Sequence, residues 1–183
     1  MATWYSDVLH STGVDGTAPT HGHQPRAGLQ HYPIKTSRVT LGTSYLDNEV
    51  IVFQPVDPND RLRSLLVTAG ATFNASTTLT IDFGLYKLNP TTGELGAVID
   101  LDVFASLVNI DATAIARVDL FGEATTLVNL DRMKRFWELA EIPVNLDPAQ
   151  GRGETWAICG QLNVSGTVTG GGSMLMEAEI YKG

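Results

Sequence analysis

Hydrophobic and polar residues alternate most clearly at positions 77–86, TTLTIDFGLY. The hydrophobic residues occupy every second position: Leu79, Ile81, Phe83 and Leu85. A period of two, with β-branched and aromatic residues, is what a strand needs to bury one face and expose the other. We therefore expect residues 77–86 to form a central strand of a two-layer β structure.

Several further stretches have the length and composition of strands. Residues 155–164 and 173–181 alternate in the same way, and residues 49–54 (EVIVFQ) carry hydrophobic side chains on both faces. The remaining candidates are residues 38–43, 63–69 and 113–121. About seven or eight strands, separated by turns, predict a mainly all-β fold: an antiparallel β-sandwich and, in particular, a jelly roll.

One or two short helices are expected between the strands. Asp100 can cap a helix, since hydrophobic residues follow it at helical spacing: Leu101, Phe104, Leu107 and Val108. Residues 129–141 predict the more convincing helix, which Pro143 ends. Its hydrophobic stripe consists of Leu130, Met133, Phe136, Trp137 and Ala140. We expect this stripe to pack against the core.

Residues 1–35 differ from the rest of the chain and predict an extended N-terminal arm, followed by one jelly-roll domain at 36–183. Glycine and proline interrupt the arm too often for a helix or a long strand. Its aromatic residues are unusual for a disordered tail. We expect the arm to dock on a partner through Trp4, Tyr5, Leu29 and Tyr32. The alternative is that the arm folds back over its own core.

Composition and charge argue against several classes of function. A formal net charge of −8 and a pI near 4.8 disfavour nucleic-acid binding, because phosphate neutralisation needs a clustered positive face. No stretch approaches the roughly 20 apolar residues that span a bilayer, so no membrane partner is expected. The N-terminus lacks the pattern of a secretory signal. We expect a soluble protein that is made in the cytoplasm.

Residues that carry chemistry are few. All four histidines lie in the arm: His10, His21, His23 and His31. None has a recognised metal-ligand spacing. Asp57, Asn59 and Asp60 fit a turn better than a calcium loop. Cys159 is the only cysteine, so no intrachain disulfide can form, and we expect it to be a packing residue rather than a nucleophile. We expect no catalytic residue, no cofactor and no metal, and hence no enzyme.

Four stretches of the body together resemble a known family. They are LTIDFGLYKLNPTTGELGAVID, DVFAS, KRFWELAEIPVNLDP and GTVTGGGSMLMEAEIYKG. The combination resembles small virion proteins of tailed bacteriophages, the capsid decoration or cement proteins with a jelly-roll body. The resemblance covers residues 36–183 and leaves the arm out. It implies a homotrimer on the capsid exterior of the virion, where it binds the major capsid protein and stabilises contacts between capsomers.

Two alternatives remain at this stage. A jelly roll can also serve as a receptor- or carbohydrate-binding module of a head fibre or tail. The candidate loops for sugar binding, 87–97 and 145–154, contain no aromatic residue, which disfavours that function. The other alternative is a structural component of the tail or neck.

Overall fold

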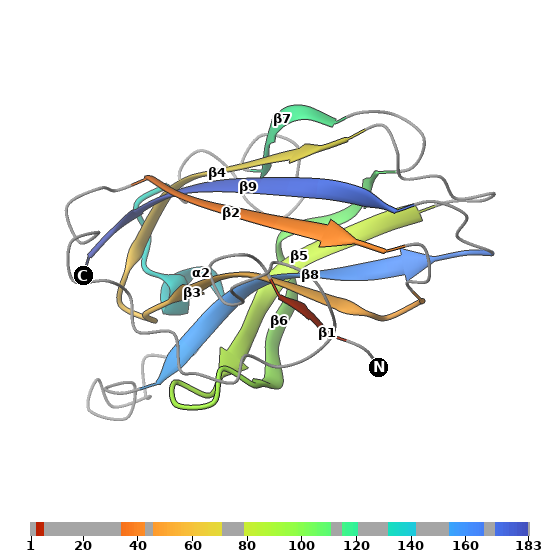
Figure 1. Cartoon of the computed structure of the whole chain (residues 1–183). Coiled ribbons are helices and arrows are strands. Elements are labelled where there is room, and N and C mark those ends of the chain that lie inside the picture. Colours follow the sequence, from red (N-terminus) through yellow and green to blue (C-terminus); the bar gives the residue numbers. More distant parts are fainter. Residues whose placement is uncertain are drawn as a thin grey trace.

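The computed structural model of the chain describes residues 3–5, 34–42, 46–70, 79–110, 115–120, 132–141, 154–166 and 171–182. Two β-sheets face one another across a hydrophobic core (Figure 1). The strands are β1 (Thr3–Tyr5), β2 (Ile34–Leu41), β3 (Val50–Val56), β4 (Arg61–Ala69), β5 (Leu79–Leu88), β6 (Leu95–Asn109), β7 (Ile115–Asp119), β8 (Thr155–Val164) and β9 (Gly172–Tyr181). One helix of a single turn, α2 (Phe136–Leu139), lies among the described residues.

The order of the strands is that of a jelly roll. The larger sheet has the order β1-β3-β8-β5-β6, and the smaller sheet has the order β2-β9-β4-β7. The chain crosses repeatedly between the sheets, so neighbours such as β2 and β9 come from distant parts of the sequence. Every pairing between described strands is antiparallel except that of β1 with β3. The predicted antiparallel β-sandwich of jelly-roll type is therefore confirmed.

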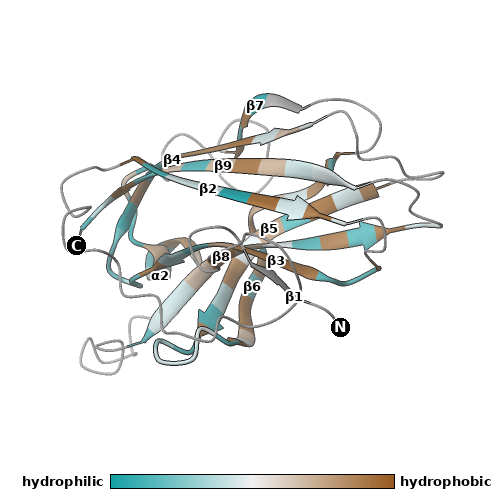
Figure 2. Cartoon of the chain, viewed as in Figure 1, coloured by the Kyte–Doolittle hydropathy of each residue, from teal (hydrophilic) through white to brown (hydrophobic). Residues whose placement is uncertain are grey.

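The predicted central strand is β5, which lies between β8 and β6 in the larger sheet. Its alternating hydrophobic residues Leu79, Ile81, Phe83 and Leu85 are all fully buried. Phe83 packs against Phe53 of β3 with 6.1 Å between the ring centroids. Figure 2 shows bands of hydrophobic residues crossing the strands of both sheets. The period-two pattern thus locates the core between the sheets.

A second, smaller cluster of buried residues lies on the opposite face of the larger sheet. Its members alternate with the core residues along their strands: Val50, Val52, Tyr86, Leu88, Ala157 and Cys159. Leu95 and Leu101, both from β6, pack against this cluster. The larger sheet is therefore hydrophobic on both faces, and the expectation that residues 49–54 bury both faces is confirmed.

The prediction of a helix after Asp100 is wrong, because residues 95–109 form the long edge strand β6. Phe83 and Leu85, two residues apart on β5, pair with Ala105 and Asp100 on β6. Extra residues of β6 therefore bulge out between these two pairs. The bulge breaks the period of two, and this is why the hydrophobic spacing resembled that of a helix. At Gly84 an added Cβ would collide with the backbone of the bulge.

The helix predicted at 129–141 is wrong in extent. Only Phe136–Leu139 is helical among the described residues 132–141, and residues 129–131 lie outside them. The preceding residues are held by backbone hydrogen bonds: Met133 N–H donates to Leu62 O and Leu62 N–H donates to Lys134 O. Pairing with β4 therefore overrides the helical propensity of this segment. Phe136 is buried and packs edge-on against Phe104.

The remaining predicted strands match β2, β3, β4, β7, β8 and β9. β2 begins at Ile34, so the last two residues of the expected arm, 34 and 35, belong to this strand. The C-terminal strand is tied into the sandwich, since Lys182 Nζ forms an ion pair with buried Asp60 Oδ2 at 2.8 Å. None of the described helices is long and apolar enough to cross a membrane.

Candidate interaction surface

The residues first considered for chemistry have structural roles where the structure describes them. Asp57 Oδ1 accepts a hydrogen bond from Asn59 N at 2.8 Å, and Asp60 N–H donates to Asp57 O, as in a tight turn. The four histidines lie outside the described residues. Within the described part of the chain, no three His, Cys, Asp or Glu side chains come together to hold a metal ion.

Cys159 is fully buried on β8 within the second cluster. Burial raises the pKa of its thiol well above the ordinary value, because the thiolate would lose its hydration. The same cluster raises the pKa of Tyr86 to about 12, chiefly through burial, with Cys159 and Asp82 contributing. Both side chains are therefore neutral at physiological pH, and Cys159 has the packing role expected of it.

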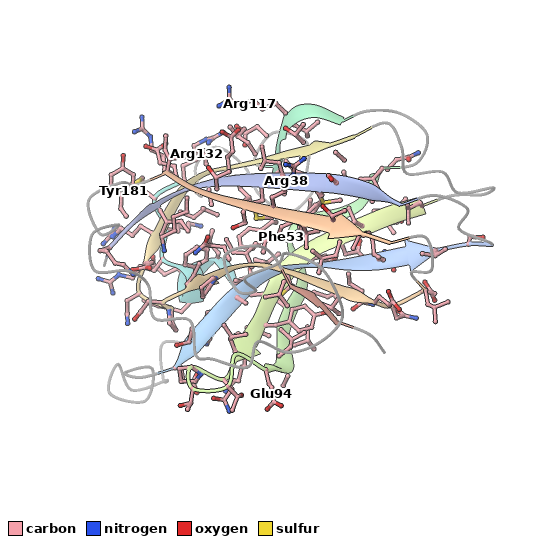
Figure 3. The ribbon with its side chains drawn as sticks, viewed as in Figure 1. Arg38, Phe53, Glu94, Arg117, Arg132 and Tyr181 are labelled. Atoms are coloured by element: carbon pink, nitrogen blue, oxygen red, sulfur yellow. The ribbon has the colours of Figure 1, made fainter. Side chains whose placement is uncertain are left out.

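The outer face of the smaller sheet is charged and solvated. Arg63 pairs with Glu179, and Arg117 pairs with Glu177, at 3.1 Å in both pairs. Tyr181 donates a hydrogen bond to Glu179. Figure 3 shows Arg117, Arg132 and Tyr181 projecting around this sheet. Exposed ion pairs of this kind contribute little to stability and typify a surface in contact with water.

A network around Asp82 lies at the end of β8 in the larger sheet. Asp82 Oδ1 accepts hydrogen bonds from Ser106 Oγ at 3.2 Å and from Leu107 N at 2.6 Å. Its Oδ2 accepts from Asn163 Nδ2 at 2.8 Å. Asp82 is only 7% exposed, so three donors satisfy a carboxylate that is almost removed from water. The network ties β5, β6 and β8 together.

Leu107 is held by this network in an unusual conformation. Its φ is 53°, a left-handed value that costs a leucine about 1–2 kcal/mol. The residue is 63% exposed although it is hydrophobic. A strained backbone that displays an apolar side chain persists only where neighbouring interactions hold it, and such positions are frequent at functional sites. Leu107 is therefore a candidate contact residue.

Leu46 flanks the same end of β8 from the other side. Leu46 is 67% exposed, and the next residue, Asp47, accepts a hydrogen bond from Val164 N at 2.9 Å. Asn48 N–H donates to Leu162 O. We call the residues Leu46, Asp47, Leu107 and Asn163 the β8-end surface. In Figure 1 the arrowhead of β8 lies at the end of the sheet where β5 begins.

The other exposed large hydrophobic residues of the described chain lie elsewhere. Ile34 is the first residue of β2, Met133 precedes α2, and Val98 is in register with Tyr86, farther along β5. The β8-end surface thus carries two exposed leucines at one end of the larger sheet, one beside β8 and one on β6. Sequence reasoning did not find it, because neither leucine is marked by a motif and the φ of Leu107 has no glycine or asparagine to signal it.

Two of the predicted arm anchors lie in β1 and two do not fall in the described chain. Trp4 and Tyr5 are in register with Ile51 and Val52 at the edge of β3. Leu29 and Tyr32 lie outside the described residues. The structure therefore places the start of the arm beside the larger sheet, on the edge opposite β6.

Comparisons with known proteins give one useful match. No protein-family model and no curated protein matches the chain. Among solved structures, a chain of the structure titled "Capsid of Ralstonia phage GP4" matches with a TM-score of 0.51 and 8% sequence identity. The match covers 100% of this chain and 99% of that chain. At this identity the match establishes a shared fold alone. The match includes both sheets, because it covers the whole of this chain.

Proposed function

We propose that this chain is a structural protein of a tailed-bacteriophage virion, a decoration or cement protein that binds the outer surface of the head. The observation that carries the proposal is the fold match along both chains to the protein from the Ralstonia phage GP4 capsid structure. The resemblance of residues 36–183 to phage decoration proteins supports the same role independently of the fold. The proposed partner is the major capsid protein.

The proposed mechanism is mechanical and involves no catalysis. Pressure from the packaged genome strains the contacts between capsomers, and a rigid body that bridges them adds buried surface where they would separate. The sandwich supplies rigidity, since strands of both sheets pack on a continuous core. The β8-end surface supplies two exposed leucines, and the Asp82 network holds one of them, Leu107, at a fixed position. Such side chains contribute to an interface when water is excluded around them.

The arm is proposed to add avidity. We propose a homotrimer, so that three arms act together on one site of the head. Linking weak contacts in this way raises overall affinity by about 10²–10⁴ without any new type of contact. Trp4 and Tyr5 are the two proposed anchors that fall within the described residues, in β1, and aromatic residues carry much of the energy of protein interfaces.

The test uses heads assembled without this protein. Purified full-length chain is added, heads are sedimented, and bound protein is measured together with the temperature at which the heads release their DNA. Binding and a higher release temperature are expected. Failure of the full-length chain to bind heads contradicts the proposed function. Binding to isolated tails, or to glycans, in place of heads favours one of the alternative functions.

A deletion of residues 1–33 tests the arm separately. β2 begins at Ile34, so the deletion leaves β2 to β9 intact and removes only β1 from the larger sheet. The truncated chain is expected to unfold cooperatively and to bind heads at least ten-fold more weakly. A full-length variant with both Trp4→Ala and Tyr5→Ala is the control for the loss of β1, because it removes the two aromatic side chains without deleting the strand. Unchanged head binding by both variants contradicts the role of the arm.

A further inference from the structure

β1 occupies an unusual place in the larger sheet. It consists of three residues at the edge of the sheet, in register with Val50–Val52 of β3. It makes the parallel pairing in a sandwich whose other described pairings are antiparallel. β1 is therefore an addition to the jelly roll, and the eight strands β2 to β9 form the complete pattern without it.

The edge of β3 is suited to accept such an added strand. Val50, Ile51 and Val52 are each at most 1% exposed, so hydrophobic side chains on both faces of this edge are covered. An uncovered edge strand presents unpaired N–H and C=O groups that pair readily with another chain. Strand addition to such an edge uses main-chain hydrogen bonds. Residues 3–5 of any copy of the chain can therefore pair equally well with the edge of β3.

The connection from β1 to β2 is far longer than is usual between neighbouring strands. β1 contacts both β2 and β3, and connections between neighbouring elements of compact domains commonly have about 2–6 residues. Yet 28 residues lie between Tyr5 and Ile34. Fully extended, a segment of this length spans on the order of 90–100 Å. It is long enough for β1 to reach β3 of a neighbouring copy.

We propose that β1 is exchanged between copies of the chain: in the assembled protein, residues 3–5 of one copy pair with β3 of the next. This inference rests on the proposed function only in that copies assemble side by side. The contacts of β1 with β3 are the same within one chain and between two chains, so exchange costs little beyond the entropy of the connection. Loop entropy varies slowly with length. Neighbouring copies at high local concentration then favour exchange.

The exchange can be trapped by disulfides between register partners. Thr3 is in register with Val50, and Tyr5 with Val52, which places each pair within the Cα separation of about 4.4–6.8 Å that a disulfide needs. Two chains with different tags are co-expressed, one with Thr3→Cys and the other with Val50→Cys. Both carry Cys159→Ala, so that no other thiol is present. A disulfide that joins the two tags can form only between copies.

Exchange predicts a covalent heterodimer on a non-reducing denaturing gel. About half of the T3C chains are expected in it, because a neighbour drawn at random is a V50C chain half of the time. The Tyr5→Cys and Val52→Cys pair repeats the test at a second register position. T3C paired with Arg63→Cys, on the outer face of the smaller sheet, is the negative control and is expected to give no heterodimer.

Absence of a heterodimer from both register pairs overturns the exchange. A heterodimer of equal yield from the R63C control overturns it as well, because the cross-link would then report random collision. The experiment is done on purified protein without heads. Failure of exchange therefore leaves head binding to be judged on its own, and failure of head binding leaves the cross-link interpretable.

Discussion

The backbone N–H of Leu107 donates a hydrogen bond to Oδ1 of Asp82 over 2.6 Å. This contact joins a leucine that has a φ of 53° and is 63% exposed to an aspartate that is only 7% exposed. A polar group inside the larger sheet thereby fixes the position of an apolar group on its rim. The same carboxylate binds Asn163 of β8, so the position of Leu107 depends on three strands.

Replacing Asp82 by asparagine should destabilise the protein by about 1–3 kcal/mol. Both carboxylate oxygens accept hydrogen bonds, so the amide NH₂ of asparagine would face a donor in either orientation. The free energy of unfolding is measured by urea denaturation. Ser106→Ala removes one donor and leaves the carboxylate two others, so it should cost only about 0.5–1.5 kcal/mol. An Asp82→Asn variant as stable as wild type contradicts the role assigned to the network.

Replacing Leu107 by glycine should separate stability from binding. Glycine adopts positive φ without strain, so the variant should be more stable by about 0.5–1 kcal/mol. It also removes the apolar side chain of the β8-end surface, so head binding should weaken. Val98→Gly is the matched control, since Val98 is also exposed on β6 but has no positive φ. That variant should lose about 0.5–1 kcal/mol. Equal effects of both substitutions on stability would show that φ of Leu107 stores no strain.

Replacing Gly84 by alanine should displace the β6 bulge. The new Cβ would collide with the carbonyl oxygens of Asp100 and Leu101, which are backbone atoms of the bulge. Overpacking of this kind costs about 1–3 kcal/mol or more. Gly96→Ala, on the neighbouring strand β6, is the control, because its Cβ would meet the side chain of Lys87 at 3.2 Å, where small movements suffice. Thermal melts that fall equally for both variants argue against a close approach at Gly84.

Stability should fall at alkaline pH through Cys159 and Tyr86. Their pKa values are raised in the folded protein, so folding holds their protons more tightly than the unfolded chain does. Their contributions are fully present below the ordinary pKa values of 9.0 and 10.0 and are lost as pH rises above them. For Tyr86 the loss is complete once pH passes about 12.

Urea denaturation between pH 8 and 11 measures this loss. Cys159→Ala should flatten the decline that begins near pH 9, and Tyr86→Phe should flatten the decline that begins near pH 10. Tyr86→Phe also removes the hydrogen bond to Gln161 Oε1. The variants are therefore compared by the slope of the free energy of unfolding against pH, and not by its absolute value. A wild-type slope that neither substitution changes contradicts burial of these two groups.

The sequence predicted the parts of the fold where local pattern and tertiary structure agree. Leu79, Ile81, Phe83 and Leu85 alternate, and β5 buries them all. The pattern failed where a bulge in β6 breaks the period of two, and where Leu62 draws residues 132–135 out of a helix. Neither the bulge nor the pairing leaves a signal in neighbouring residues, since both depend on strands distant in the sequence.

The candidate site could be predicted only in part. Trp4 and Tyr5 were noticed because aromatic residues are unusual in a segment rich in glycine and proline. The sequence could not indicate that they lie beside β3, because strand pairing is not local. The exposed Leu46 and Leu107 look like core residues in the sequence, and only the fold places them on the surface.

The central claim is that this protein holds other proteins together on the outside of a phage head. Electron cryomicroscopy of phage particles assembled in the presence of this chain tests this most directly. The account predicts density for the two-sheet body outside the head shell, in contact with more than one capsomer. Particles that lack the protein, or that carry it only in the tail or neck, would contradict the account.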